Sequence, residues 1–316
     1  MHFSKFFPLL SLWLGATSNV VAAPSFEFKK GTLGPLSGHG SGSGSPDDTG
    51  LAKRESAGCG KHPSLKQRAA GMKKLQGMRK SHRNNQKMSE ITLPVHMFII
   101  ATNETEEGGW IPDSRIDEQM QILNDDFANA LITWELLNVT RIIHQEWFEG
   151  VNDNKLDAQM KKQLRVGEAD VLNIYTVELS RKIFGYATLP EDYDDDPTGD
   201  GVVMNYRTFP GASLKSFNEG RTLTHEVGHW CGLYHTFSEE GDDEGCDGDG
   251  DFVDDTPPQL IATRGCVPQD SCADHPGQDP LTNFMDYSDD SCMQEFTPGQ
   301  VERMRNELEA YREIEY

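Results

Sequence analysis

Apolar positions recur along the chain with two different spacings, and together they predict a mixed α/β domain. Apolar runs typical of strands occupy residues 91–101, 132–143, 171–177, 183–189 and 202–206. Helical spacing appears between residues 114 and 129, where the apolar stripe consists of Ile116, Met120, Leu123 and Phe127. Strands that alternate with helices predict a mixed sheet covered by helices.

Two further helices and one irregular region are predicted in the second half of the chain. One helix starts near Arg221. The other starts after Thr297, where Pro298 suits the first helical position and Gln300 completes a capping box. Its apolar stripe consists of Val301, Met304, Leu308 and Tyr311. Residues 236–296 show no periodicity and hold four of the six cysteines, which favours an irregular subdomain held by disulfides.

Three segments precede the main domain, which we expect to span residues 88–316. Residues 1–22 resemble a signal peptide, with Lys5 before an apolar run at 6–16 and small residues at 20–23. That run is shorter than the ~20 apolar residues of a membrane span, which favours export over anchoring. Residues 23–58 form a Gly/Ser-rich linker with a dibasic pair, Lys53-Arg54, and residues 59–87 form a basic segment. Helical spacing in the basic segment involves Leu65, Ala69, Met72, Leu75 and Met78.

Charge is distributed very unevenly between these segments. Residues 61–87 carry nine Lys/Arg and no Asp/Glu, whereas residues 88–316 carry 15 Lys/Arg against 47 Asp/Glu, a net of −32. Such an acidic body is a poor partner for nucleic acid or an anionic membrane. The basic run could bind nucleic acid or dock on the acidic body, and docking is favoured.

Other features fit a secreted, extracellular protein. Six cysteines that follow an export signal are expected to form disulfides rather than free thiols. Glycosylation sequons begin at Asn103 and Asn138. The first opens an acidic loop and is favoured, while the second lies inside an apolar segment where burial would prevent modification.

The strongest chemical signal is the run Thr224-His225-Glu226-Val227-Gly228-His229-Trp230-Cys231-Gly232-Leu233-Tyr234-His235. Histidines four residues apart lie on one helix face, so His225 and His229 can bind one cation. Gly232 can end the helix, and His235 then returns as a third ligand. Three nitrogens leave one open position on a tetrahedral Zn²⁺, which is the catalytic arrangement, and Glu226 is placed to act as a general base.

This long motif resembles the metzincin zinc proteases, whose methionine turn is matched by Met285 within residues 283–287. Beyond this motif, the amino-acid sequence resembles the pappalysin family, especially its secreted fungal extracellular metalloproteases. The matching blocks are residues 59–60, 200–203, 223–230, 232–237, 254–257 and 283–293. The resemblance covers roughly residues 59–316, although Cys231 stands where an apolar residue is expected.

The resemblance implies a fold and an activity. The fold is an α/β zincin-like domain, with a twisted, mixed five-stranded sheet, a backing helix and an active-site helix in an upper subdomain to about residue 235. A lower subdomain spans residues 236–316. The strand at 183–189 is the expected antiparallel edge along the cleft, where a peptide substrate would add as a further strand. Tyr287 is expected to stabilise the oxyanion.

The acidic run at 239–255 has two interpretations. It is a solvated loop, or it holds a structural Ca²⁺ through Asp251, Asp254 and Thr256, as the resemblance implies. The spacing does not fit an EF-hand, since Phe252 and Pro258 stand where that loop needs Gly and Glu. A calcium-dependent binding or adhesion module that only holds zinc is the alternative function, but such a module has no need of Glu226.

The cysteines and the acidic surface give the remaining expectations. The resemblance selects the disulfides Cys246–Cys272 and Cys266–Cys292. Cys59 and Cys231 are either bridged, which is favoured, or Cys59 is a latency thiolate that caps the zinc. The net charge and Asp289-Asp290 predict protein or peptide substrates with a weak preference for a basic residue just after the scissile bond. The sequence leaves the physiological substrate and the oligomeric state open.

Overall fold

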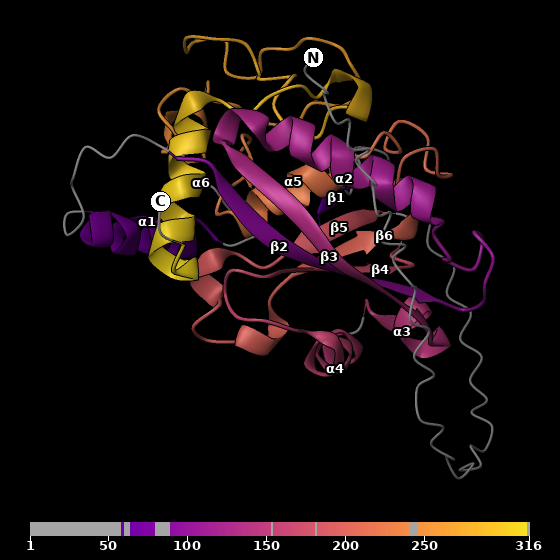
Figure 1. Ribbon diagram of the computed structural model, residues 1–316. Coiled ribbons are helices and arrows are strands. Elements are labelled where there is room, and N and C mark those ends of the chain that lie inside the picture. Colours follow the sequence, from indigo (N-terminus) through magenta and orange to yellow (C-terminus); the bar gives the residue numbers. More distant parts are fainter. Residues whose placement is uncertain are drawn as a thin grey trace, which may run out of the picture.

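A computed structural model describes residues 58–59, 64–79, 89–152, 154–180, 182–239 and 245–314 (Figure 1). The expected signal peptide at 1–22 and nearly all of the linker at 23–58, with Lys53-Arg54, lie outside the described residues. No helix in the described part of the chain is long and apolar enough to cross a membrane.

The centre of the fold is a mixed sheet with the strand order β1-β5-β6-β4-β2-β3. Its strands are β1 (Gly58–Cys59), β2 (Ile91–Ala101), β3 (Ile132–Ile143), β4 (Leu172–Val177), β5 (Ile183–Ala187) and β6 (Val202–Asn205). All neighbours are parallel except β5 and β6. The predicted five-stranded sheet is therefore confirmed in β2–β6. The central strand β4 is buried along its whole length, as expected for a parallel strand covered on both faces.

Helices cover both faces of this sheet (Figure 1). The backing helix α2 (Asp113–Phe127) and the active-site helix α5 (Arg221–Trp230) lie on one face, and α3 (Gln145–Gly150) and α4 (Asn154–Leu164) lie on the other. The predicted stripe of α2 is buried from Ile116 to Phe127. Short 3-10 turns connect these elements: η1 (Ala128–Ala130), η2 (Pro190–Asp192), η3 (Pro197–Gly199), η4 (Tyr206–Thr208), η5 (Gly245–Asp247) and η6 (Asp290–Cys292).

The C-terminal helix α6 (Pro298–Arg312) joins the irregular subdomain to the rest of the chain. It begins as predicted: the Thr297 hydroxyl caps the Gln300 backbone, and the Gln300 side chain returns to the Thr297 N–H. Its apolar stripe packs into the shared core. The irregular subdomain contains the disulfides Cys246–Cys272 and Cys266–Cys292, as the resemblance implied.

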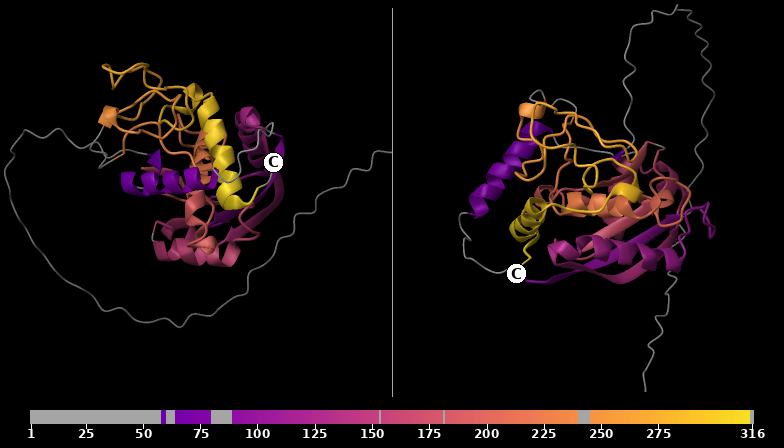
Figure 2. Two further views of the ribbon diagram at one scale, coloured as in Figure 1. Left: turned by 90° about the vertical axis from the view of Figure 1, so that its left-hand side faces the viewer. Right: turned by 90° about the horizontal axis from the view of Figure 1, so that it is seen from above.

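The basic segment forms α1 (Leu65–Arg79), which lies beside α6 in both views of Figure 2. It docks on the body, as expected, but its buried face differs from the predicted stripe. Arg68 and Leu75 are buried, whereas Ala69 is exposed. The reason is that the surface opposite α1 offers polar partners: the Arg68 guanidinium donates to Gly250 O at 3.1 Å and lies 5.8 Å from the Tyr234 ring centre.

Candidate zinc site and cleft

Helix α5 and the turn that follows it bring three imidazoles to one point. The Nε2 atoms of His225, His229 and His235 lie 3.0–3.1 Å from one another, and all three side chains are buried. Gly232 ends the helix at φ +95°, a left-handed conformation that suits glycine, so the chain can reverse toward His235. Within the described residues, this is the group of His, Cys, Asp and Glu side chains whose ligand atoms could hold one metal ion.

Hydrogen bonds to the other ring nitrogens fix how these imidazoles bind. Nδ1 of His225 lies 2.6 Å from Phe284 O, and Nδ1 of His229 lies 2.8 Å from Leu233 O. Nδ1 of His235 pairs with the Glu239 carboxylate. Each Nδ1 therefore donates its proton to an acceptor, which leaves three Nε2 lone pairs facing one another. Such an arrangement fits a divalent cation and is unfavourable without one.

Glu226 lies beside this triad, between α5 and the strand β5. Its side chain is 1% exposed. The strand approaches closely because residue 185 is glycine: a Cβ built on Gly185 would lie 2.7 Å from Glu226 Cγ and 2.8 Å from Oε1. Gly185 was not recognised as a site residue from the sequence. Its only signal is a glycine inside a predicted strand, which often marks a close approach.

The methionine turn supports the triad from below. Met285 is fully buried, and its backbone N–H donates to Asn283 Oδ1 at 2.9 Å. The adjacent Phe284 carbonyl is the acceptor for His225. A Cβ built on Gly228 of the active-site helix would lie 2.5 Å from Met285 Sδ, so the Met285 side chain lies directly against that helix.

Tyr287 also lies where the sequence suggested. Its ring centre is 5.6 Å from that of His225 and 4.8 Å from that of His235. The Arg264 guanidinium lies 4.9 Å from the Tyr287 ring centre. Burial lowers the pKa of Arg264, while the neighbouring Tyr287 and Asp286 oppose that shift.

Two arginines of α6 hold the turn between the second and third histidines, and neither was anticipated. Arg303 Nε donates to Gly232 O at 2.8 Å, and its Nη1 donates to Asp251 O at 2.9 Å. Arg312 Nε donates to Trp230 O at 3.1 Å. They satisfy carbonyls that the end of α5 leaves without helical partners.

The predicted disulfide between Cys59 and Cys231 is wrong. Cys231 is a free cysteine, fully buried in the hydrophobic core at the end of α5. Cys59 lies in β1, in register with Gly185 on the far side of β5. The expectation that β5 forms the free edge of the sheet is corrected as well, because β1 pairs with its outer edge.

The remaining predicted residues occupy surface or loop positions. Asp251 is buried and its Oδ1 accepts from the Val253 N–H and the Thr256 hydroxyl, whereas Asp254 is exposed. Both sequon asparagines are exposed: Asn103 in its acidic loop and Asn138 on β3.

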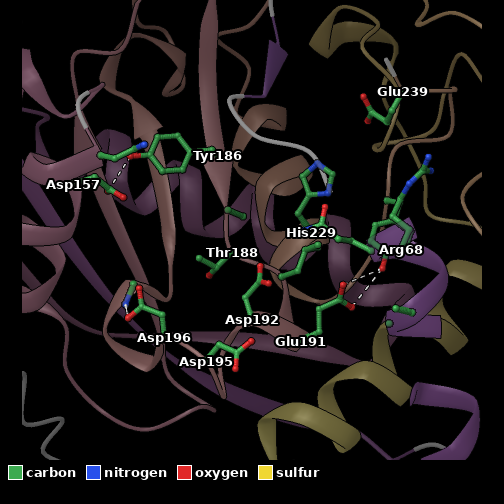
Figure 3. Close-up of a pocket in the computed structure, with 18 of the residues that line it drawn as sticks. Arg68, Asp157, Tyr186, Thr188, Glu191, Asp192, Asp195, Asp196, His229 and Glu239 are labelled. Atoms are coloured by element: carbon green, nitrogen blue, oxygen red, sulfur yellow. Dashed lines mark hydrogen bonds between the residues drawn. The ribbon is translucent and has the colours of Figure 1, made fainter. Parts of the chain in front are cut away.

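Two spaces flank the triad. A cavity of about 720 Å³ opens beside His229 and His235 (Figure 3). A small pocket of about 30 Å³ lies on the other side, beside His225, Glu226 and Tyr287. The three histidines therefore line two separate spaces, a large cavity and a small pocket.

Comparison with known proteins agrees with this geometry. Residues 156–309 match the family model described as pregnancy-associated plasma protein-A. An extracellular metalloprotease of Verticillium alfalfae is 40% identical over 220 residues, which cover 68% of this chain and 76% of the relative. The chain belongs to the pappalysin family of metalloproteases. A second extracellular metalloprotease of that fungus is 38% identical over 81% of this chain and 90% of the relative.

Solved pappalysin structures show the same fold. Mature mirolysin of Tannerella forsythia, in complex with a cleaved peptide, aligns with a TM-score of 0.58 at 32% identity over 69% of this chain and 92% of its own. A promirolysin mutant aligns with a TM-score of 0.64 at 29% identity, over 78% of this chain and 91% of its own. As a pappalysin, the chain is a zinc metalloendopeptidase that acts on peptides or proteins.

Proposed function

We propose that this pappalysin is a secreted endopeptidase in which Glu226 is the general base for peptide hydrolysis. The observation that carries the proposal is the convergence of three Nε2 atoms with the Glu226 carboxylate beside them. His225, His229 and His235 would hold a zinc ion, which when bound would supply Lewis-acid chemistry to the scissile carbonyl and to the attacking water. Glu226 takes the proton of the attacking water and later delivers it to the leaving amine.

Tyr287 is the second catalytic group that we propose. Its ring packs near two of the histidines, so its hydroxyl can approach the carbonyl oxygen of a bound peptide. Charge that develops on that oxygen would be stabilised by a hydrogen bond from the phenol. Membership of a metalloprotease family favours proteolysis over the alternative function, a calcium-dependent binding or adhesion module that only holds zinc.

Substrate is proposed to bind along β5 by strand addition, which requires β1 to leave. Gly58 and Cys59 pair with Ile183 and Gly185, so they occupy the edge that a substrate strand would use. This position supports the latency role considered for Cys59 over the disulfide. Proteolysis at Lys53-Arg54 would leave Cys59 in the chain.

Secretion is proposed from the N-terminal signal and from the relatives, which are named extracellular metalloproteases. Glycosylation at Asn103 and Asn138 and the preference for basic substrates also remain proposals. Calcium binding through Asp251, Asp254 and Thr256 is supported by one contact. The Thr256 hydroxyl donates to Asp251 Oδ1 at 2.7 Å, so these two side chains lie together in one turn. A rise in melting temperature on adding calcium to stripped, zinc-loaded protein would support it, and no change would reject it.

The test of the proposed function is direct proteolysis by the purified secreted protein. A zinc chelator should abolish cleavage of an unstructured protein substrate, and added zinc should restore it. Products should be internal fragments rather than single amino acids. Cleavage that persists after the zinc has been removed and its absence verified would contradict the proposal.

A further inference from the structure

The three histidines of the triad do not share one kind of hydrogen-bond acceptor. His225 and His229 each donate from Nδ1 to a main-chain carbonyl, at 2.6 Å and 2.8 Å respectively. Nδ1 of His235 instead faces the carboxylate of Glu239, which places a negative charge behind the third ligand. Because this acceptor belongs to a side chain, a substitution can remove it without changing the main chain.

His235 is also the ligand that no helix orients, since it follows α5 and the turn at Gly232. Its ring stacks on Phe237, with ring centres 4.6 Å apart and planes 12° apart, and its centre lies 4.8 Å from that of Tyr287. A ring flipped by 180° would stack equally well. The bond to Glu239 therefore selects the orientation that turns Nε2 toward the other two histidines.

The main chain that carries Glu239 is held by contacts that do not involve the histidine. The N–H of the preceding Ser238 donates to the Gln259 carbonyl at 2.9 Å. Gln259 is 3% exposed; its side chain accepts from the Thr236 hydroxyl at 2.7 Å and donates to Asp286 Oδ1 at 3.1 Å. Asp286 belongs to the methionine turn. The segment before Glu239 is thus tied to that turn, and the carboxylate is placed beside the imidazole in advance.

The surroundings of this pair strengthen its effect. The His235 side chain is fully buried, whereas the Glu239 side chain is 14% exposed and forms part of the wall of the large cavity (Figure 3). A mostly buried charge is screened less by salt than a charge at an open surface. An imidazole that donates to a carboxylate is also a more basic metal ligand.

We propose that Glu239 is a positioning residue of the zinc site, which holds the His235 ring by its Nδ1 proton and raises the zinc affinity of the triad through its charge. The inference rests on zinc binding by the triad, which the proposed function also requires. Loss of such a partner typically lowers metal affinity by about 10–100-fold. Glu239 acts through His235 and not on the substrate, so its effect belongs to the retention of the metal.

The test is the Kd for zinc, measured at pH 7 by transfer of the metal from the loaded, secreted enzyme to a chromophoric chelator. Glu239→Ala removes both the acceptor and the charge and should raise the Kd about 10–100-fold. Glu239→Gln keeps an acceptor oxygen but removes the charge, so its Kd should lie between those of Glu239→Ala and wild type. The stripped Glu239→Gln protein should melt at the same temperature as stripped wild type, whereas a purely structural role would lower that temperature and leave the Kd unchanged.

A matched control separates this contact from the overall charge of the cavity. Asp195 is an exposed carboxylate that lies at the lower side of the same cavity in Figure 3, whereas Glu239 lies at its top. Asp195→Asn removes one negative charge and should keep the Kd within about twofold of wild type. Equal shifts for Asp195→Asn and Glu239→Gln would overturn the inference. Wild-type affinity in Glu239→Ala or in Glu239→Gln would overturn it as well. A wild-type enzyme that binds no zinc would instead contradict the proposed function.

Discussion

Gly228 of α5 packs directly against the sulfur of Met285, and a Cβ built on Gly228 would lie 2.5 Å from Met285 Sδ. The helix that carries His225 and His229 thus rests on the methionine turn without an intervening side chain. We predict that Gly228→Ala lowers stability by about 1–3 kcal/mol, because it overpacks this contact. Thermal unfolding of the zinc-loaded variant measures the effect.

Gly77→Ala is the matched control for this substitution. Gly77 lies in α1, and a Cβ built there meets nothing within 4 Å. Alanine should therefore be neutral or stabilise by up to about 1 kcal/mol, through its better helix propensity. Equal melting temperatures for the two variants would show that the contact with Met285 has no energetic consequence.

Gly185→Ala should impair catalysis more than stability. The new methyl group would reach the Glu226 carboxylate, so the base must move while the three histidines stay in place. We expect kcat to fall at least about tenfold, as displacements near 1 Å cost up to about 10²-fold. Zinc content, measured by mass spectrometry, should stay at one ion per chain. Unchanged kcat would show that Glu226 does not act from this position.

Glu307 makes the stability of the protein depend on pH. Burial raises the pKa of Glu307 to about 8 from 4.5. Between these values the native state holds a proton that the unfolded state has lost, so the free energy of unfolding falls as pH rises from about 5 to about 8. Glu307→Gln should remove the contribution of Glu307 to this decrease in the free energy of unfolding, which is at least about 1 kcal/mol. Urea unfolding at pH 5 and pH 8 measures it.

Glu309→Gln provides the comparison on the same helix, since Glu309 is exposed. This variant should keep the wild-type slope of stability against pH. If the Glu307 and Glu309 variants have the same slope, Glu307 is not the titrating group.

The Cys231 thiol should be unreactive in the native enzyme. It is fully buried, and burial raises the pKa of its thiol well above the usual value, so little reactive thiolate forms. We expect no alkylation of Cys231 in the native enzyme and full alkylation in guanidinium chloride, without a reducing agent. A peptide map that contains Cys59 joined to Cys231 would contradict the structure.

The metal site could be predicted from sequence because its signal is local. The spacing of His225 and His229 follows from helix geometry, and Gly232 and His235 fix the following turn. The capping box at Thr297 and the stripe of α2 are equally short-range patterns. Helix α4 carried such a signal unnoticed, since Leu156, Met160 and Leu164 recur at four-residue spacing.

Long-range contacts could not be predicted in the same way. The pairing of β1 with β5 involves only two residues, too few for any periodicity. Arg68 is buried because Gly250 and Tyr234 meet it from distant parts of the chain. The position of Cys231 on the core side of α5, rather than toward Cys59, likewise depends on how that helix packs.

The most direct test of the central claim is peptide cleavage by Glu226→Gln, a substitution that keeps the shape of the side chain but removes the base. We predict that the variant retains one zinc ion per chain and the wild-type melting temperature. Its kcat/KM should fall by about 10²–10⁴-fold, the usual contribution of a general base. Undiminished cleavage by a zinc-loaded Glu226→Gln enzyme would contradict the account.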